Sequence, residues 1–105
     1  MSDYTPSMRI LLCETNPAMR ELIPVLLRDN EVTCVDDPSK LPLFAGFDVL
    51  VTNCEVFDAD IPTLFISFTA DRCKKAAAHG IAVLPKPFTA EELHEAVRKL
   101  RERHA

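Results

Sequence analysis

Residues that could do chemistry are concentrated in four short segments, each directly after an apolar run. The segments are 13–16 (Cys-Glu-Thr-Asn), 52–55 (Thr-Asn-Cys-Glu), 67–69 (Ser-Phe-Thr) and 85–87 (Pro-Lys-Pro). They supply thiols and hydroxyls as potential nucleophiles, carboxylates as metal ligands, and an ammonium group that can bind an anion. If the apolar runs are strands of one parallel sheet, the four segments meet at the carboxyl edge of that sheet, where ligands usually bind.

Cys13 is a potential nucleophile because it ends an apolar run just before a helix start. This placement resembles the phosphocysteine-bearing subunits of sugar phosphotransferase systems and the small tyrosine phosphatases, in which a loop of small residues surrounds a phosphate. Here residues 14–17 contain no glycine, Pro17 lacks an amide donor, and Arg20 lies too far along the chain for the phosphatase arginine. A Cys13-based phosphotransfer enzyme is therefore an alternative, and not the favoured interpretation.

The cysteines and histidines show no spacing that is typical of metal ligands. We expect reduced, mostly buried thiols at Cys13, Cys34, Cys54 and Cys73, because a free cysteine packs as a small hydrophobic side chain. The three histidines, His79, His94 and His104, are expected on helix surfaces. The sequence thus predicts no metal site and no cofactor.

Composition limits the class of protein. The chain has 105 residues, of which 48% are hydrophobic, which suits one globular domain. Its formal charge of −4 is the wrong sign for binding nucleic acid or anionic lipid. No apolar run is long enough to span a bilayer, and residues 1–7 do not resemble a secretory signal. We therefore expect a cytoplasmic protein that binds neither nucleic acid nor membrane, with a disordered lead over residues 1–7.

The apolar pattern predicts strands that alternate with helices. Strands are expected at 8–13, 31–35, 47–52, 63–68 and 81–84, and helices from 17 to about 29, over 69–80 and from 90 onward. Asn16 before Pro17 is a helix start, and Thr89 with Glu92 forms a capping box. Thr69 is expected to cap the middle helix. Such alternation is typical of an α/β domain with a parallel sheet.

Three segments resemble the receiver domain of bacterial response regulators. The resemblance covers roughly residues 8–103, and we expect the receiver-like domain to span residues 8–105. They are Lys86-Pro87-Phe88 with the capped helix that follows, the stretch 9–22 and the stretch 47–53. The resemblance implies a single doubly wound five-stranded parallel sheet of flavodoxin-like order 2-1-3-4-5. It also implies a place in two-component signalling, where receivers accept a phosphoryl group from a histidine kinase.

The resemblance also implies that the phosphoacceptor pocket is degenerate. The family's chemistry needs an aspartate where this chain has Asn53, and an acidic pair where it has only Glu14 followed by Thr15. Ser67 and Lys86 match the family's hydroxyl and lysine positions. An amide cannot attack phosphorus as a carboxylate does, and Mg²⁺ prefers carboxylate oxygens. We therefore expect no phosphoryl transfer and poor Mg²⁺ binding, with Lys86 holding the pocket together by bonding Asn53.

Two connections are too short for the helices that the family carries. Only the nine residues from Asn53 to Ile61, followed by Pro62, separate the third strand from the fourth, whereas a helical crossover usually takes about a dozen or more. The segment 38–46 contains Pro38, Pro42 and Gly46, so helices two and three should be reduced or missing. The sheet face they would cover must be covered instead by Leu41, Leu43, Phe44, Phe57 and Ile61, or by another chain, and we expect a partner or homodimer surface there.

The favoured interpretation is a non-enzymatic, phosphorylation-incompetent receiver-like protein that acts by protein–protein interaction. It would be an adaptor or competitor for a histidine kinase, a phosphotransfer protein or another receiver. The predicted partner-binding residues are Met19, Ile23, Pro87, Phe88, Phe44 and Phe57. One alternative is an active phosphoacceptor that uses a displaced acid, Asp58 or Glu55, and another is that the chain is the input module of a longer protein.

Overall fold

A single five-stranded parallel sheet organises the chain. The structure is a computed structural model that describes residues 8–42 and 44–103. The strands are β1 (Arg9–Cys13), β2 (Glu31–Val35), β3 (Val49–Thr52), β4 (Thr63–Ser67) and β5 (Ala82–Pro85). Their order is β2-β1-β3-β4-β5, and all neighbours are parallel. The predicted flavodoxin-like α/β fold is confirmed. The predicted lead at 1–7 and Leu43 lie outside the described residues.

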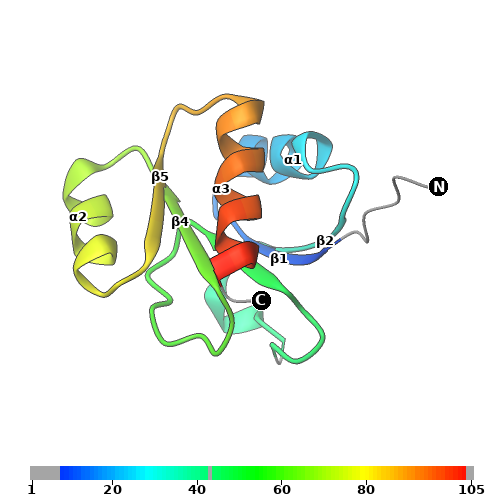
Figure 1. Cartoon of the computed structure of the whole chain (residues 1–105), viewed down its shortest axis with the longest axis horizontal. Coiled ribbons are helices and arrows are strands. Elements are labelled where there is room, and N and C mark those ends of the chain that lie inside the picture. Colours follow the sequence, from blue (N-terminus) through cyan, green and yellow to red (C-terminus); the bar gives the residue numbers. More distant parts are fainter. Residues whose placement is uncertain (1–7, 43, 104–105) are drawn as a thin grey trace.

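Three α-helices flank the sheet in the described ranges. They are α1 (Pro17–Leu26), α2 (Ala70–Ala78) and α3 (Ala90–Arg103), and a single 3-10 turn, η1, covers Pro38–Lys40. In Figure 1, α1 and α3 lie close together, while α2 stands apart beside β5. The apolar stripes of α1 and α3 pack on the same face of the sheet, so α2 is the only α-helix of the described residues on the other face.

The helix boundaries follow from local hydrogen bonds. Asn16 caps α1 by accepting a bond from the amide of Met19, as predicted. The helix ends at Leu26 and not near Asp29, because Leu27 leaves the helical conformation and Asn30 bonds back to the Leu27 carbonyl.

The other two helix starts differ from each other. At α3, Thr89 and Glu92 bond each other's backbone amides at 2.8 and 3.0 Å, which confirms the capping box. At α2, Thr69 stands at the N-cap position, but its side chain makes no capping hydrogen bond, so that part of the prediction is wrong. Gly80 follows the helix with a φ of +77°, a conformation that favours glycine.

Side chains of the central strands alternate between two apolar layers. Ile10 and Leu12 of β1 belong to the larger cluster, which α1 and α3 complete through Ile23, Leu93 and other residues. Leu11 and Leu50 belong to the smaller cluster on the opposite face. This is the pattern of a sheet that is buried on both faces.

Helices two and three of the receiver pattern are missing, as predicted. Only η1 lies between β2 and β3 in the described residues, and the connection from β3 to β4 contains no helix. Both connections are too short for a helix, because each has only enough residues to return from the end of one strand to the start of the next.

Loops cover the sheet face that the missing helices leave. Leu11 and Leu50 are fully buried beneath Leu41, Phe44, Phe47, Val56 and Ile61, which are themselves half-buried. Phe57 packs on Phe65 of β4 with ring centroids 5.9 Å apart. The protein's own loops therefore bury the strand residues of this face without another chain. Phe44 and Phe57 are only half-buried, so the partner surface at these two residues stays a prediction.

The four cysteines are free thiols in different surroundings. Cys13 and Cys54 are buried, Cys73 is half-buried, and Cys34 is exposed. Cys34 corrects the expectation of mostly buried thiols, because it lies on β2, an edge strand with an open face. Within the described residues, no helix is both long and apolar enough to cross a membrane.

Candidate functional site

The predicted pocket residues gather at the carboxyl edge of the sheet. Glu14 and Thr15 follow β1, Asn53 follows β3, Ser67 ends β4, and Lys86 follows β5. Neighbouring parallel strands bring these positions together, although Glu14 and Lys86 are 72 residues apart in the chain. The prediction that they share one region of the fold therefore holds.

A buried ion pair occupies the centre of this edge. The Nζ atom of Lys86 lies 2.9 Å from Oε1 of Glu14, and the side chains are 4% and 0% exposed. The second carboxylate oxygen of Glu14 accepts a hydrogen bond from the amide of Asn16 at 3.0 Å. Both oxygens of the only carboxylate in the pocket are thus already engaged by the protein itself.

Asn53 is held by Thr15 through both ends of its amide. Its Nδ2 donates to Oγ1 of Thr15 at 2.8 Å, and its Oδ1 accepts from the backbone amide of Thr15 at 3.1 Å. The guanidinium of Arg72, from α2, also donates to the Asn53 carbonyl at 2.5 Å. These bonds fix the side chain at the position where the receiver pattern has its phosphoacceptor.

The expected bond between Lys86 and Asn53 is not formed, and this prediction is corrected. Lys86 does hold the pocket together, but through the carboxylate of Glu14. The physical reason is charge, since an ammonium group that is nearly fully buried is stabilised far more by a carboxylate than by a neutral amide. With the amide of Asn53 satisfied by Thr15, the two pairs do not compete.

Ser67 lies in the pocket without bonding its other predicted members through its hydroxyl. Its Oγ accepts a hydrogen bond from the amide of Thr69 at 3.0 Å, and its carbonyl accepts one from the amide of Lys86 at 2.9 Å. Ser67 is buried, and its hydroxyl stabilises the turn that leads into α2. Its clearest role is therefore structural.

Two residues near the pocket were not among the predicted site residues. Phe68 is 67% exposed, yet the Nζ atom of Lys86 lies 5.3 Å from its ring centroid, within cation–π range. Arg20 donates to the carbonyl of Glu14 at 2.9 Å. An aromatic residue directly after the fourth strand was a possible signal for Phe68, whereas nothing in the local pattern identifies Arg20.

The displaced acid Glu55 is held by cations from α2. Its carboxylate lies 2.5 Å from Nζ of Lys75 and 3.5 Å from Nε of Arg72. The hydrogen bond from Lys75 lowers the pKa of Glu55, so this group stays ionised and paired. Asp58, the other displaced acid, is exposed on the loop between β3 and β4.

The residues present do not fit a Mg²⁺ ion. A receiver-type magnesium site needs several hard oxygen ligands, and this pocket offers one carboxylate, that of Glu14, which is paired with an ammonium group. No group of three or more His, Cys, Asp or Glu side chains that could hold a metal ion occurs among the described residues.

Cys13 is unsuited to act as a nucleophile. It is fully buried, and its Sγ lies 3.7 Å from that of Cys54. Burial, together with the neighbouring Cys54, raises the pKa of Cys13 to about 12. Because the thiolate is the reactive form, a buried thiol with such a pKa does not attack a phosphate at neutral pH.

The predicted partner-binding residues beside the pocket are not all accessible. Pro87 is exposed, and Met19 and Phe88 are half-buried. Ile23 is fully buried in the larger core cluster, so the prediction that it contacts a partner is wrong. The helix period placed Ile23 on the apolar face of α1, and that face packs on the sheet.

The chain is similar to solved structures of response regulator receiver domains. The chain matches a response regulator receiver domain protein from Clostridium thermocellum with a TM-score of 0.79 and 21% identity, covering 92% of this chain and 96% of that one. It matches the signal receiver domain of a putative LuxO repressor protein from Vibrio parahaemolyticus with a TM-score of 0.76 and 16% identity, over 93% and 92% of the chains. It matches the chemotaxis response regulator CheY4 of Vibrio cholerae with a TM-score of 0.69 and 19% identity, over 90% and 99%.

The protein thus has the fold of a response regulator receiver domain. No protein-family model matches the sequence, and no curated protein matches it in a sequence search. The fold is therefore recognised from structure at low sequence identity.

Proposed function

We propose that this protein serves two-component signalling by binding a partner protein, without accepting a phosphoryl group and without enzymatic activity. The observation that carries the proposal is the state of Asn53. An amide stands at the phosphoacceptor position, and Thr15 engages both its nitrogen and its oxygen. An amide is a poor nucleophile, and this one is also fixed in place.

The surrounding groups support the same conclusion. Among the described residues, no buried side-chain nitrogen or oxygen lacks a hydrogen-bond partner. Lys86, which would bind phosphoryl oxygens in a receiver, is neutralised by Glu14. A phosphoryl group would have to break this ion pair in a nearly buried site, which costs several kcal/mol by typical values.

The surface beside the pocket supports a docking role. Met19 on α1 and Pro87 and Phe88 on the loop before α3 are at least partly accessible. The structural likeness to receivers makes a histidine kinase, a phosphotransfer protein or another receiver the proposed partner, and the cytoplasm the proposed location. Met19→Glu should weaken such a complex, whereas Val25→Glu, at an exposed position elsewhere on α1, should not. The measurement is titration calorimetry with the purified partner.

Incubation with acetyl phosphate and Mg²⁺, followed by phosphate-affinity electrophoresis and intact mass spectrometry, tests the absence of phosphorylation. We expect a single unshifted band. A stoichiometric adduct would overturn the proposal. If the adduct disappeared in Glu55→Gln or in Asp58→Asn, that residue would be identified as a displaced acceptor.

A further inference from the structure

Two thiols from neighbouring strands meet beneath the pocket. Cys13 ends β1, and Cys54 follows the end of β3 by two residues. Their Sγ atoms lie 3.7 Å apart, although the residues are 41 positions apart in the chain. Both side chains belong to the smaller apolar cluster, on the sheet face that loops cover. The fold thus places two sulfur atoms in contact.

The backbone around this pair is held on both sides. Cys13 directly precedes Glu14 and Thr15, and Cys54 directly follows Asn53. The two hydrogen bonds between Thr15 and Asn53 join the chain next to the thiols. The amide of Cys54 also donates to Oγ1 of Thr52 at 2.9 Å, which fixes the bend after β3. Because these bonds keep the sulfurs close, one thiol is present at the other at a high effective concentration.

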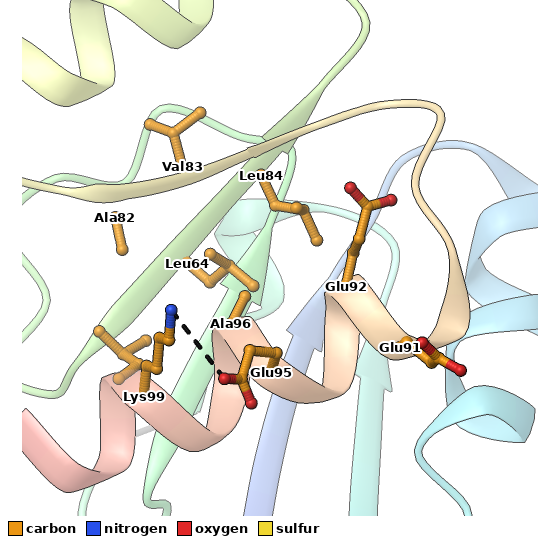
Figure 2. A pocket seen from close by; sticks show the side chains of 10 residues that line it. Leu64, Ala82, Val83, Leu84, Glu91, Glu92, Glu95, Ala96 and Lys99 are labelled. Carbon is orange, nitrogen blue, oxygen red and sulfur yellow. Dashed lines mark ion pairs between the residues drawn. The ribbon is translucent and has the colours of Figure 1, made fainter.

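The two thiols differ in their access to solvent. Cys13 is fully buried, whereas Cys54 is 9% exposed. The groove of about 460 Å³ between α3 and β5, shown in Figure 2, lies on the opposite face of the sheet and includes neither thiol. A reagent from solution therefore meets Cys54 first, and a small one such as hydrogen peroxide needs little room to do so.

We propose that Cys13 and Cys54 form a peroxide-sensitive dithiol, which hydrogen peroxide converts to an intramolecular disulfide. First, Sγ of Cys54 attacks one peroxide oxygen, the O–O bond breaks, and the other oxygen leaves as water with the thiol proton, so that Cys54 becomes a sulfenic acid. Next, Sγ of Cys13 attacks the sulfur of Cys54, the S–O bond breaks, and the leaving hydroxide departs as water with the proton of Cys13. The two sulfurs together lose two electrons, and the peroxide gains them.

The second step is compatible with the low acidity of Cys13. Burial and the neighbouring Cys54 raise the pKa of Cys13 to about 12, so this thiol is inert toward reagents in solution at neutral pH. The sulfenic sulfur, however, is in contact with it, and the hydroxide that leaves this sulfur accepts the proton. The sulfurs must approach from 3.7 Å to about 2.05 Å, and Cys54, which lies in a bend and not in a strand, can supply that movement.

The disulfide would fasten the loop after β3 to β1. This loop covers the sheet face in place of a helix, with Val56, Ala59 and Ile61 packed on the smaller cluster. A cross-link between residues 41 positions apart also restricts the unfolded chain, which stabilises the folded state. We therefore expect oxidation to slow amide hydrogen exchange in residues 55–61 and to raise the midpoint of thermal unfolding by about 10 °C. The inference is independent of the proposed function, which uses neither thiol.

The test uses the variant Cys34→Ser/Cys73→Ser, in which Cys13 and Cys54 are the only cysteines left. The dilute protein is treated with excess hydrogen peroxide, unfolded, alkylated, and analysed by intact mass spectrometry and non-reducing electrophoresis. We expect a monomer whose mass has fallen by two hydrogen atoms and which takes up no alkylating reagent. Dithiothreitol should return both thiols. Thermal melting and hydrogen exchange are then measured on the oxidised and the reduced protein.

Two further changes in this variant test the order of the steps. Cys13→Ala leaves Cys54 without its partner, so dimedone, which traps sulfenic acids, should label Cys54. With Cys54→Ala instead, the buried Cys13 should be labelled at least about tenfold less. The matched control is Cys13→Ala/Cys54→Ala, which keeps Cys34 on β2 and Cys73 on α2 and should form no intramolecular disulfide. Thermal melting checks that each variant folds.

Several results would overturn the inference. Two free thiols after peroxide treatment, a cross-link between chains, or oxidation of Cys54 to a sulfinic acid while Cys13 stays free would each show that the sulfurs do not join. A lower melting midpoint, or unchanged exchange in residues 55–61, would show that the disulfide forms only in a distorted chain. The acetyl phosphate and partner-binding experiments do not involve these thiols, so their outcomes and this one are separate.

Discussion

The buried ion pair between Lys86 and Glu14 gives a quantitative test of the pocket. Lys86→Met keeps the length of the side chain but removes the charge, and it leaves the Glu14 carboxylate fully buried with one remaining hydrogen bond, from Asn16. Removing one partner of such a pair typically costs about 3–5 kcal/mol, because the other charge stays buried and unpaired. That loss is a large share of the roughly 5–15 kcal/mol by which small domains are stable.

Removing the other partner of the pair, in Glu14→Gln, should reduce the stability less. In Glu14→Gln the amide oxygen can still accept from Asn16, and the long side chain of Lys86 lies against the exposed ring of Phe68, from which its ammonium group can reach water. The double variant Glu14→Gln/Lys86→Met removes both charges and should recover more than half of the stability that Lys86→Met loses.

Urea unfolding followed by circular dichroism measures these differences. The matched control is Lys40→Met, which removes a lysine from an exposed pair with Asp36 that has nearly the same distance, 2.8 Å, and should leave stability almost unchanged. If Lys86→Met were no more destabilising than Lys40→Met, the pair would not be buried as described. If Lys86→Met does not fold, the double variant still should, and its failure to fold would equally refute the reasoning.

Three further predictions concern the pocket, the thiols and the caps. Asn53→Asp should gain no Mg²⁺-dependent labelling by acetyl phosphate on phosphate-affinity gels, because the metal ligands are still missing; clear labelling would show that the metal site is intact. Iodoacetamide at neutral pH should modify exposed Cys34 and leave buried Cys13 unmodified until denaturant is added. Peptide mass spectrometry measures this, and early modification of Cys13 would contradict its raised pKa of about 12. Thr89→Ala should lower the free energy of unfolding, measured by thermal melting, by about 1 kcal/mol, and Thr69→Ala clearly less, because only Thr89 makes a side-chain cap bond. Equal losses of stability in the two variants would contradict the difference between the two helix starts.

Local sequence signals predicted most of the secondary structure. The alternation of apolar runs with capped helices identified all five strands and three helices, with boundaries shifted by up to three residues. The capping box of Thr89 and Glu92 was predictable because its hydrogen bonds join residues three apart. The Thr69 cap was wrong because a threonine at the N-cap position does not by itself direct its hydroxyl to the amides of the first turn, and here that bond is not made.

The exposure of individual residues was harder to predict. Ile23 was placed on a partner surface because the helix pattern shows an apolar face but does not say what covers it. The same limit applied to the loop residues around Phe44, whose cover of Leu11 and Leu50 depends on how two loops fold back over the sheet.

The sequence by itself determined the chemistry of the pocket, because the amide at Asn53, the single acid at Glu14 and the lysine at Lys86 are fixed by residue type. It also determined that two connections are too short for helices. Only the tertiary structure decided which groups pair. Thr15 meets Asn53 across the neighbouring strands β1 and β3, and Glu14 meets Lys86 although β3 and β4 lie between their strands.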